Sequence, residues 1–388
     1  MPLSSRDRTS RMRITLKRQP EIDALRGLFL VWMVLTHLPT HMSDFVNQPF
    51  GFVSSAEGFV FVSAMLTSRL YLRQSVPDEP SFHFRIWRRA LQLYGFHLVM
   101  LLLAFTVAAA LAVHTNSIAL ENLLNFYLAH PAVAIVGSIF LVYTPPLLDI
   151  LPMYVLFLAF SPPILSFARR YGWRIVMAAS GLLWLGGQLG LRALVHAAIV
   201  RVTHLHIPLQ ETGAFNLFSW QLVWTSGLWL GARSARPEGA LPHFPPWVTT
   251  LAAAICVFCI GIRHDWLGKH LTVERVGVLF DKWQLTPLRI LNLLAFVIVC
   301  WAIRDIAKHL LAIEPLLTLG RASLEVFCAH IFFCFVGLAL LYQDTPQLHG
   351  WRAAGLLVIT FTALIWIAAH EVRRRRAKKR LASQQASI

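Results

Sequence analysis

The chain has 388 residues, of which 56% are hydrophobic and 14% are charged, and its mean hydropathy is +0.59. Because soluble domains carry roughly 25% charged residues, this composition excludes an ordinary soluble protein and indicates that the chain is embedded in lipid. The formal net charge is +16, but the basic residues lie at the two ends and in short loops rather than on a separate soluble domain. This placement argues against nucleic-acid binding.

The cysteines and histidines do not form a metal-binding motif. All five cysteines lie within apolar segments, and Cys256 and Cys259 lack both a second cysteine pair and a nearby histidine. His37 and His41 have the i,i+4 spacing of zinc ligands, but the sequence HExxH is absent. We therefore expect no metal ion, and we interpret the cysteines as buried, inert thiols.

Ten segments are apolar and long enough to cross a membrane, since a helix needs roughly 20 apolar residues to span the hydrocarbon core. The sequence therefore predicts an all-α, polytopic membrane bundle of about ten transmembrane helices. A further apolar stretch, 132–144, is shorter and leads into Pro145, so we interpret it as a re-entrant or interfacial piece. The ten segments are 22–40, 51–72, 90–113, 147–168, 174–195, 214–232, 246–262, 286–303, 322–342 and 351–370.

The distribution of lysine and arginine predicts that both ends of the chain are cytoplasmic, because cytoplasmic loops are rich in these residues. The two tails are strongly basic, whereas the alternate loops 41–50 and 114–146 contain no lysine or arginine. The outer loop 263–285 departs from this rule with four basic residues. The expected organisation is a basic tail (1–20), a transmembrane domain that begins with an uncleaved anchor helix (21–371), and a second basic tail (372–388).

The first span contains three residues that are costly in lipid. Asp23, Arg26 and His37 fall on one face of a helix that turns by about 100° per residue. With the N-terminus inside, Asp23 and Arg26 lie near the cytoplasmic surface, and His37 lies roughly 16 Å beyond Arg26, in the outer half. The alternatives are that Asp23 and Arg26 simply pair with each other and that His37 is an idle interfacial histidine.

The second span runs back from the outside and carries Glu57 at a depth similar to that of His37. Ser54, Ala64 and Ser68 share its face, and such small residues let a neighbouring helix approach closely. The short connection makes the first span the natural neighbour. We therefore predict that the Glu57 carboxylate lies beside the His37 imidazole, orients the ring and raises its basicity. The alternative is that Glu57 has no catalytic role.

Other polar residues stand at or near the ends of later spans and are candidates for binding a polar substrate. Helix capping and hydrogen bonding between helices are the alternative explanation. The candidates are Tyr154, Asn216, Trp220, Gln221 and His330.

Six segments, spread from about residue 20 to residue 370, form a recognisable series: EIDALRGLFLVWMVLTHLP (21–39), FGFVSSAEGFVFVSAMLTSRLY (50–71), LDILPMYVLFL (148–158), FNLFSWQLVWTSG (215–227), LTPLRILNLLAF (285–296) and LGRASLEVFCAHI (319–331). In this order they resemble the OpgC-type membrane acyltransferases, a branch of the wider acyltransferase-3 group. The basic residue, ten intervening residues and histidine of that group are met by Arg26 and His37. Family members often have Ser-Gly and an aromatic residue where this chain has Ser63-Ala64-Met65, so we expect altered helix packing there.

The resemblance implies about ten transmembrane helices in the bacterial inner membrane. It also implies transfer of an acyl group from cytoplasmic acyl-coenzyme A to an extracytoplasmic glycan. In this branch the acyl group is succinyl and the acceptor is a periplasmic glucan; an acetyl group is the alternative. Carried onto this chain, His37 is the catalytic histidine, and Asp23, Arg26 and Glu57 are its supporting polar residues. Direct transfer with His37 as general base and an acyl-histidine intermediate are both open.

Coenzyme A is polyanionic, so an arginine-rich mouth on the cytoplasmic side suits it as the donor. The candidate arginines are Arg26, Arg69, Arg73, Arg85, Arg88 and Arg89. The expected partners are the lipid bilayer and the glycan acceptor, with no nucleic acid.

A transporter or flippase for an anionic lipid or glycan is the alternative function. The buried histidine, glutamate and arginine would then line a path through the bundle. Many transporters have internal repeats and paired broken helices at matching positions, and the sequence has neither. A purely structural membrane protein would leave the buried polar residues unexplained.

Overall fold

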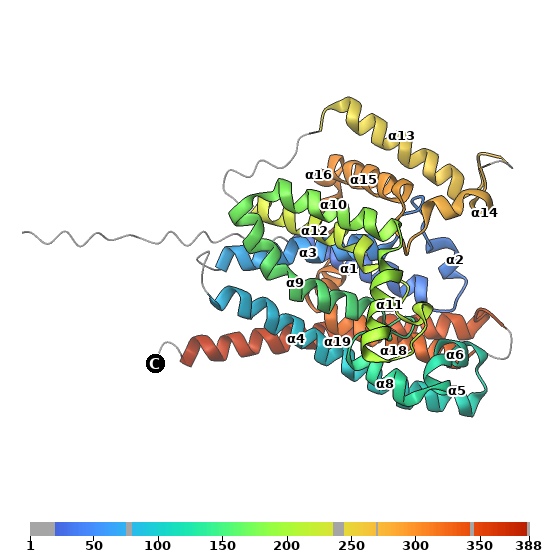
Figure 1. The fold of residues 1–388 in the computed structure, drawn as a ribbon. Helices are drawn as coiled ribbons and strands as arrows, with labels where there is room; N and C mark the ends of the chain where they lie inside the picture. Colours follow the sequence, from blue (N-terminus) through green and yellow to red (C-terminus); the bar gives the residue numbers. More distant parts are fainter. Residues whose placement is uncertain (1–19, 75–79, 236–243, 269–270, 342–344, 386–388) are drawn as a thin grey trace, which may run out of the picture.

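The computed structural model describes residues 20–74, 80–235, 244–268, 271–341 and 345–385, and over these ranges the chain is helical (Figure 1). An isolated bridge joins Thr40 to Leu348, and no β-strand forms in the described ranges. The predicted all-α fold is therefore confirmed. The N-terminal basic tail falls on residues 1–19, which lie outside the described residues.

The first half of the chain follows the expected apolar segments. A π-helical turn, η1, joins α4 to α5 without interrupting the helix, and the apolar stretch 132–144 forms only the nine-residue helix α8. The elements are α1 (Pro20–His37), α2 (Met42–Val46), α3 (Ser55–Gln74), α4 (Pro80–Leu103), η1 (Ala104–Ala108), α5 (Ala109–Thr115), α6 (Ile118–Leu123), α7 (Asn125–Ala129), α8 (Pro131–Ile139), α9 (Ile150–Tyr171), α10 (Trp173–Gln188) and α11 (Leu191–Thr203).

The second half continues the same pattern and ends in the longest helix. The elements are η2 (Leu209–Glu211), α12 (Leu217–Ser234), α13 (Pro246–Arg263), α14 (Val273–Val276), η3 (Gly277–Phe280), α15 (Pro287–Ala302), α16 (Arg304–Leu311), α17 (Glu314–Arg321), α18 (Ser323–Ala339) and α19 (Gly350–Gln385).

Fewer helices than the ten predicted are long and apolar enough to cross a membrane. Four helices of the described chain are long and apolar enough to cross a membrane, namely His83–Thr115, α9, α13 and α19. Two bent pairs, α10 with α11 (78°) and α17 with α18 (92°), raise the number to six if each pair is one span. Each predicted segment does coincide with a helix or a bent pair. The remaining helices are too short, as in α15 with 16 residues, or too polar, as in α1 and α3, which carry charged side chains.

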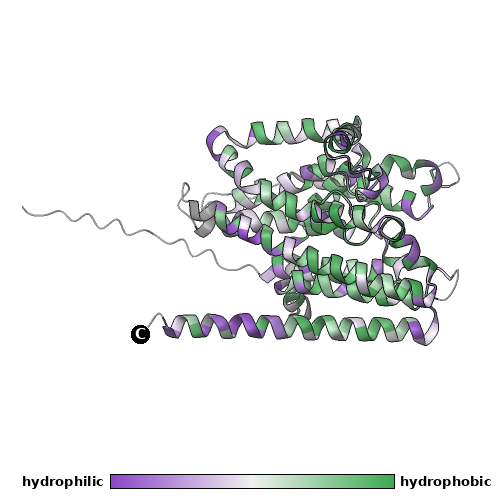
Figure 2. Ribbon diagram, turned by 60° about the horizontal axis from the view of Figure 1, so that its bottom comes forward, coloured by the Kyte–Doolittle hydropathy of each residue, from purple (hydrophilic) through white to green (hydrophobic). Residues whose placement is uncertain are grey.

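Helix α19 has 36 residues and joins two segments that the sequence analysis separated. At about 1.5 Å per residue it is roughly 54 Å long, which exceeds the ~30 Å hydrocarbon core. Figure 2 shows an apolar first part and a hydrophilic C-terminal part that projects beyond the other helices. The basic segment expected as a tail at 372–388 is therefore helical as far as Gln385.

The outward faces of the long helices carry large apolar side chains. In a soluble protein such faces would be buried, but in lipid they contact the acyl chains. Examples with more than half of the side chain exposed are Leu102, Leu182, Leu189, Val257, Val358 and Trp366.

Helix α1 packs directly against α17, and two glycines permit this close approach. A Cβ atom on Gly27 would overlap the carbonyl oxygen of Leu316, and one on Gly320 would overlap that of Asp23. Small residues at such crossings let helix backbones meet in membrane proteins. The contact therefore depends on both glycines.

Helices α3 and α12 make a second close contact where the sequence lacks the family's usual glycine. A Cβ atom on Gly227 of α12 would overlap the Phe61 carbonyl and crowd Ala64, and one on Gly231 would overlap the Met65 carbonyl. The glycines of α12 thus supply the room for an alanine at position 64.

We expect Gly320→Ala to destabilise the folded protein by about 1–3 kcal/mol or more, because the added methyl group must push α17 away from α1. The thermal unfolding midpoint in detergent measures this loss. Gly181→Ala is the matched control, since a Cβ atom there meets open space and alanine is the better helix former. Equal midpoints for the two variants would show that the close contact is unimportant.

Candidate active site

His37, the last residue of α1, meets His330 from the middle of α18. His37 Nδ1 lies 3.2 Å from His330 Nε2, and the two rings stack at a centroid distance of 5.5 Å. His330 is buried, whereas His37 is partly exposed. The other ring nitrogen of His330, Nδ1, lies 2.6 Å from the carbonyl oxygen of Phe327.

These contacts determine which nitrogens carry protons. A carbonyl oxygen only accepts hydrogen bonds, so His330 Nδ1 donates to Phe327 and His330 Nε2 is the acceptor in the neutral ring. His37 Nδ1 must then donate to His330 Nε2. This leaves His37 Nε2 with a free lone pair, which is the form of histidine that takes a proton from a substrate.

Glu57 forms a buried ion pair with Arg289 of α15. Its Oε1 accepts from Arg289 Nε at 2.7 Å and lies 2.5 Å from Nη2, and both side chains are at most 1% exposed. Its Oε2 accepts from the backbone N–H of Ser54 at 3.1 Å and from the Ser54 hydroxyl. Arg289 Nη1 also donates to the Phe280 carbonyl at 3.0 Å, so the pair joins the first turns of α3 and α15.

The expected contact between His37 and Glu57 is therefore not observed. Within the part of the chain that the structure describes, no hydrogen bond or ion pair joins these two side chains. The physical reason is that Arg289, absent from the sequence prediction, neutralises the carboxylate at a site from which water is excluded. A fully charged guanidinium is a stronger partner for a buried carboxylate than a neutral imidazole.

Lys282 brings a further charge to the end of the bundle where Glu57 and Arg289 pair. Burial lowers the pKa of Lys282, and the neighbouring Glu57 carboxylate raises it. Arg289 lowers this pKa and Asp149 raises it, each by a smaller amount. Its ammonium group lies over the ring of Trp283 at 4.6 Å, and its charge also acts on His37. Lys282 thus lies within electrostatic range of Glu57, Asp149 and His37 together.

Asp23 and Arg26 lie at the opposite end of α1 and belong to a separate polar cluster. Asp23 forms an ion pair of 3.8 Å with Arg321, and Arg26 donates to the Ser323 hydroxyl and lies over the Phe59 ring. The two residues are therefore not next to His37. Their contacts hold α1 against the junction of α17 and α18, and α18 carries His330.

The arginines predicted to bind the donor also lie toward the end of the bundle where α1 begins. Arg69 lies near the end of α3, and Arg85, Arg88 and Arg89 lie in the first turns of α4; Arg89 donates to Gln92 at 2.8 Å. The side chain of Arg73 lies outside the described residues. That these arginines bind coenzyme A stays a prediction.

All five candidate substrate residues make hydrogen bonds within the protein. Tyr154 donates to the Phe59 carbonyl at 3.0 Å, and Trp220 donates to the Lys282 carbonyl at 3.2 Å. Asn216 caps α12 by accepting from Phe218, and Gln221 bonds to Ser180. These four sets of contacts fit helix capping and hydrogen bonding between helices. His330 differs, because its partner is His37, the predicted catalytic residue.

Sequence reasoning missed Arg289 and Lys282 as site residues. Both left a signal: Arg289 is a charge within the first turn of an otherwise apolar helix, and Lys282 lies in the outer loop that breaks the positive-inside pattern. Among the described residues, no group of three His, Cys, Asp or Glu side chains is arranged to hold a metal ion.

The fold and the site together define a helical membrane protein with a hydrogen-bonded pair of imidazoles, one buried and one partly exposed. The chain matches the model of the OpgC protein family over residues 18–376, nearly its whole length. It therefore belongs to the OpgC family, which confirms the resemblance seen in the sequence and indicates a membrane acyltransferase that modifies glucans. No curated protein and no solved structure matched the chain.

Glu57→Gln should destabilise the protein by about 3–5 kcal/mol, because it leaves the Arg289 charge buried without its partner. A fall in the thermal unfolding midpoint measures this effect. The double variant Glu57→Gln with Arg289→Gln should recover part of the loss, since no uncompensated charge remains.

Arg374→Gln serves as the control for the loss of an exposed ion pair. Its partner is Glu371, its own side chain is 60% exposed, and such pairs contribute at most about 1 kcal/mol. A midpoint for Glu57→Gln as high as that of Arg374→Gln would contradict the structural role of the buried pair.

Proposed function

We propose that this protein transfers an acyl group from cytoplasmic acyl-coenzyme A to a hydroxyl group of an extracytoplasmic glucan, with His37 as the general base. The observation that carries the proposal is the hydrogen-bonded series from the Phe327 carbonyl through His330 to His37, found at one end of α1 in a member of the OpgC family. The series leaves His37 Nε2 free to accept a proton.

The reaction needs one proton acceptor and returns that proton to the leaving group. His37 Nε2 removes the proton of the acceptor hydroxyl while the oxygen attacks the thioester carbonyl carbon. The new C–O bond forms, the C–S bond breaks, and the electron pair leaves on sulfur. The His37 imidazolium then gives its proton to the thiolate, so coenzyme A leaves as the free thiol and the base is regenerated.

His330 acts as a positioning residue in this scheme. It accepts the His37 Nδ1 proton in a hydrogen bond and so fixes the tautomer and the ring plane, as a carboxylate does for the histidine ligands of metal sites. Glu57 acts further away: by neutralising Arg289 it stabilises the outer ends of α3 and α15. The supporting role first assigned to Glu57 therefore passes to His330.

Donor and acceptor approach from opposite ends of α1. Arg26 and His37 are eleven residues apart, roughly 16 Å along the helix axis, and the pantetheine arm of the donor would cover this distance. Arg26, Arg69, Arg73, Arg85, Arg88 and Arg89 would hold the phosphates. The proposal therefore has both chain ends in the cytoplasm, His37 toward the periplasm and the protein in a bacterial inner membrane, with succinyl-coenzyme A or acetyl-coenzyme A as donor.

His37→Ala should abolish acyl transfer while leaving the protein abundant in the membrane. The reason is that the loss removes the base but no buried charge partner. The measurement supplies labelled acyl-coenzyme A to purified protein in nanodiscs and counts label on a glucose oligosaccharide. Transfer by His37→Ala at the wild-type rate would refute the assignment of the base.

His330→Gln and His330→Leu separate positioning from packing. Glutamine can place a carbonyl oxygen near the site of Nε2 and accept from His37 Nδ1, whereas leucine fills similar space without an acceptor. We expect the leucine variant to lose about 10²–10⁴-fold in kcat with little change in the KM of the donor, and the glutamine variant to retain much more activity. Equal kcat values for the two variants would show that the hydrogen bond from His37 has no function.

A further inference from the structure

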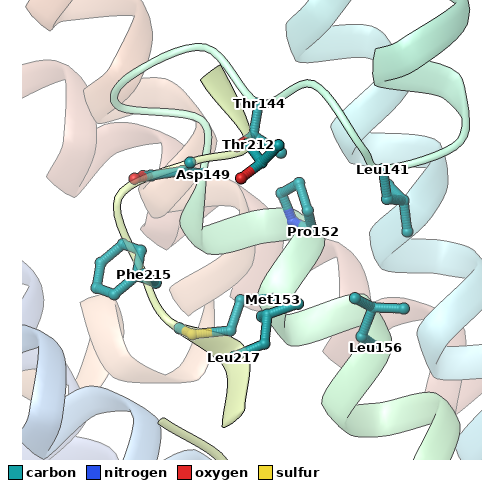
Figure 3. Close-up of a pocket in the computed structure, with 10 residues that line it drawn as sticks. Leu141, Thr144, Asp149, Pro152, Met153, Leu156, Thr212, Phe215 and Leu217 are labelled. Atoms are coloured by element: carbon teal, nitrogen blue, oxygen red, sulfur yellow. The ribbon is translucent and has the colours of Figure 1, made fainter. Parts of the chain in front are cut away.

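A small pocket opens beside the first turn of α9, apart from the two histidines. It has a volume of about 20 Å³, which is enough for one water molecule or one hydroxyl group. Figure 3 shows its polar side chains, Thr144, Asp149 and Thr212, grouped on one side, with Phe215 and the apolar side chains of α9 around the rest. Such a lining suits a ligand group that is part alcohol and part hydrocarbon.

One polar group in this lining lacks a partner. Thr144 is 5% exposed, and its hydroxyl oxygen has no hydrogen-bond partner among the described residues. Buried hydroxyl groups are nearly always hydrogen-bonded, so an orphan hydroxyl in a polar pocket points to a ligand or an ordered water. The Asp149 carboxylate can accept further hydrogen bonds, since one of its oxygens accepts from the Ala214 N–H at 3.2 Å. Burial raises the pKa of Asp149 to about 6.

The pocket lies at the level of the candidate active site. Tyr154, four residues into α9, donates to the carbonyl of Phe59, four residues into α3, so the two helices begin at the same height. Asp149 directly precedes α9, and Glu57 is in the first turn of α3. Helix α9 begins on the side of the molecule where α1 ends with His37 (Figure 1).

Lys282 and Phe215 connect the pocket to the buried ion pair. Phe215 lines the pocket and packs edge-on against Trp283 at 5.2 Å, and the Lys282 ammonium group lies 6.0 Å above the Phe215 ring. Lys282 in turn interacts electrostatically with both Asp149 and Glu57. Asp149 at the pocket and Glu57 in the buried ion pair therefore share Lys282 as an electrostatic neighbour.

We propose that this pocket binds a non-reacting hydroxyl group of the acceptor sugar and so positions its neighbour for attack. Thr144 and Asp149 provide the hydrogen bonds, and Phe215 and the α9 side chains contact the ring carbons. The donor's phosphates, and the carboxylate of a succinyl group, are too large for a pocket of about 20 Å³, which admits a single hydroxyl group. This inference rests on the proposed function, since it concerns the acceptor of that reaction.

Thr144→Val tests the inference without disturbing the fold, because the lost hydroxyl makes no hydrogen bond to the described protein. We expect a threefold to tenfold rise in the KM for a β-linked glucose oligosaccharide, about the loss of one hydrogen bond. The KM for acyl-coenzyme A should be unchanged. Asp149→Asn should shift the acceptor KM in the same direction, while its remaining carbonyl oxygen can still accept from Ala214.

Thr360→Val is the matched control, since Thr360 is also buried with an unpartnered hydroxyl but lies on α19. Its KM values should equal those of the wild type. A series of monodeoxy oligosaccharides identifies the bound hydroxyl. One analogue should bind to the wild type more weakly than the parent oligosaccharide does. To Thr144→Val, this analogue and the parent should bind equally. An unchanged acceptor KM in Thr144→Val, or equal shifts in both threonine variants, would overturn the inference.

Direct binding of the oligosaccharide to protein in nanodiscs distinguishes a failure of the proposed function from a failure of the pocket inference. If the wild type binds the sugar but transfers no acyl group, the proposed function fails. The pocket is then still tested by comparing the affinities of the wild type and of Thr144→Val for the oligosaccharide. If transfer occurs and the affinity is the same in both proteins, the pocket inference alone fails, and a structural water occupies the site.

Discussion

The close contact between α1 and α17 determines where the two histidines meet. Gly27 and Gly320 let the helix backbones touch, and the ion pair of Asp23 with Arg321 and the bond from Arg26 to Ser323 fasten the same junction. The chain then turns by 92° into α18, which presents His330. His37 lies at the opposite end of α1 from this contact, so the cluster around Asp23 and Arg321 determines where the two histidines meet.

The structure separates its paired charges into two groups at opposite ends of α1. The group around Asp23 and Arg321 continues to α19, where Arg375 pairs with Glu325 at 2.5 Å and with Glu371 at 2.7 Å. The group at the other end combines Glu57 and Arg289 with Lys282 and Asp149. In a lipid-embedded bundle an unpaired charge is costly, and this pairing leaves His37 and His330 without an ion-pair partner among the described residues.

Much of the fold followed from the sequence, whereas the pairings did not. Apolar segments located a helix or a bent pair in every case, and the resemblance to the OpgC family held over nearly the whole chain. The count of spans was wrong because hydropathy and length vary along helices that line a polar interior. Glu57 was assigned to His37 on the ground of a short loop, but its partner, Arg289, lies 232 residues away in sequence. Nothing in one sequence specifies which distant helix faces a buried carboxylate.

The identity of the histidine's partner bears on the route of acyl transfer. An acyl group on His37 Nε2 would give a positively charged acyl-imidazolium, and no carboxylate contacts either ring in the described residues. Glu57, the nearest expected counter-charge, is already neutralised by Arg289. An unpaired cation in a site of low dielectric is unfavourable, so a long-lived acyl-histidine is poorly supported. A base that passes its proton from the hydroxyl to the departing sulfur carries its charge only briefly, and a neutral partner such as His330 suffices to orient it. In the proposed reaction, the hydrogen bond between the two imidazoles therefore favours direct transfer over a covalent intermediate.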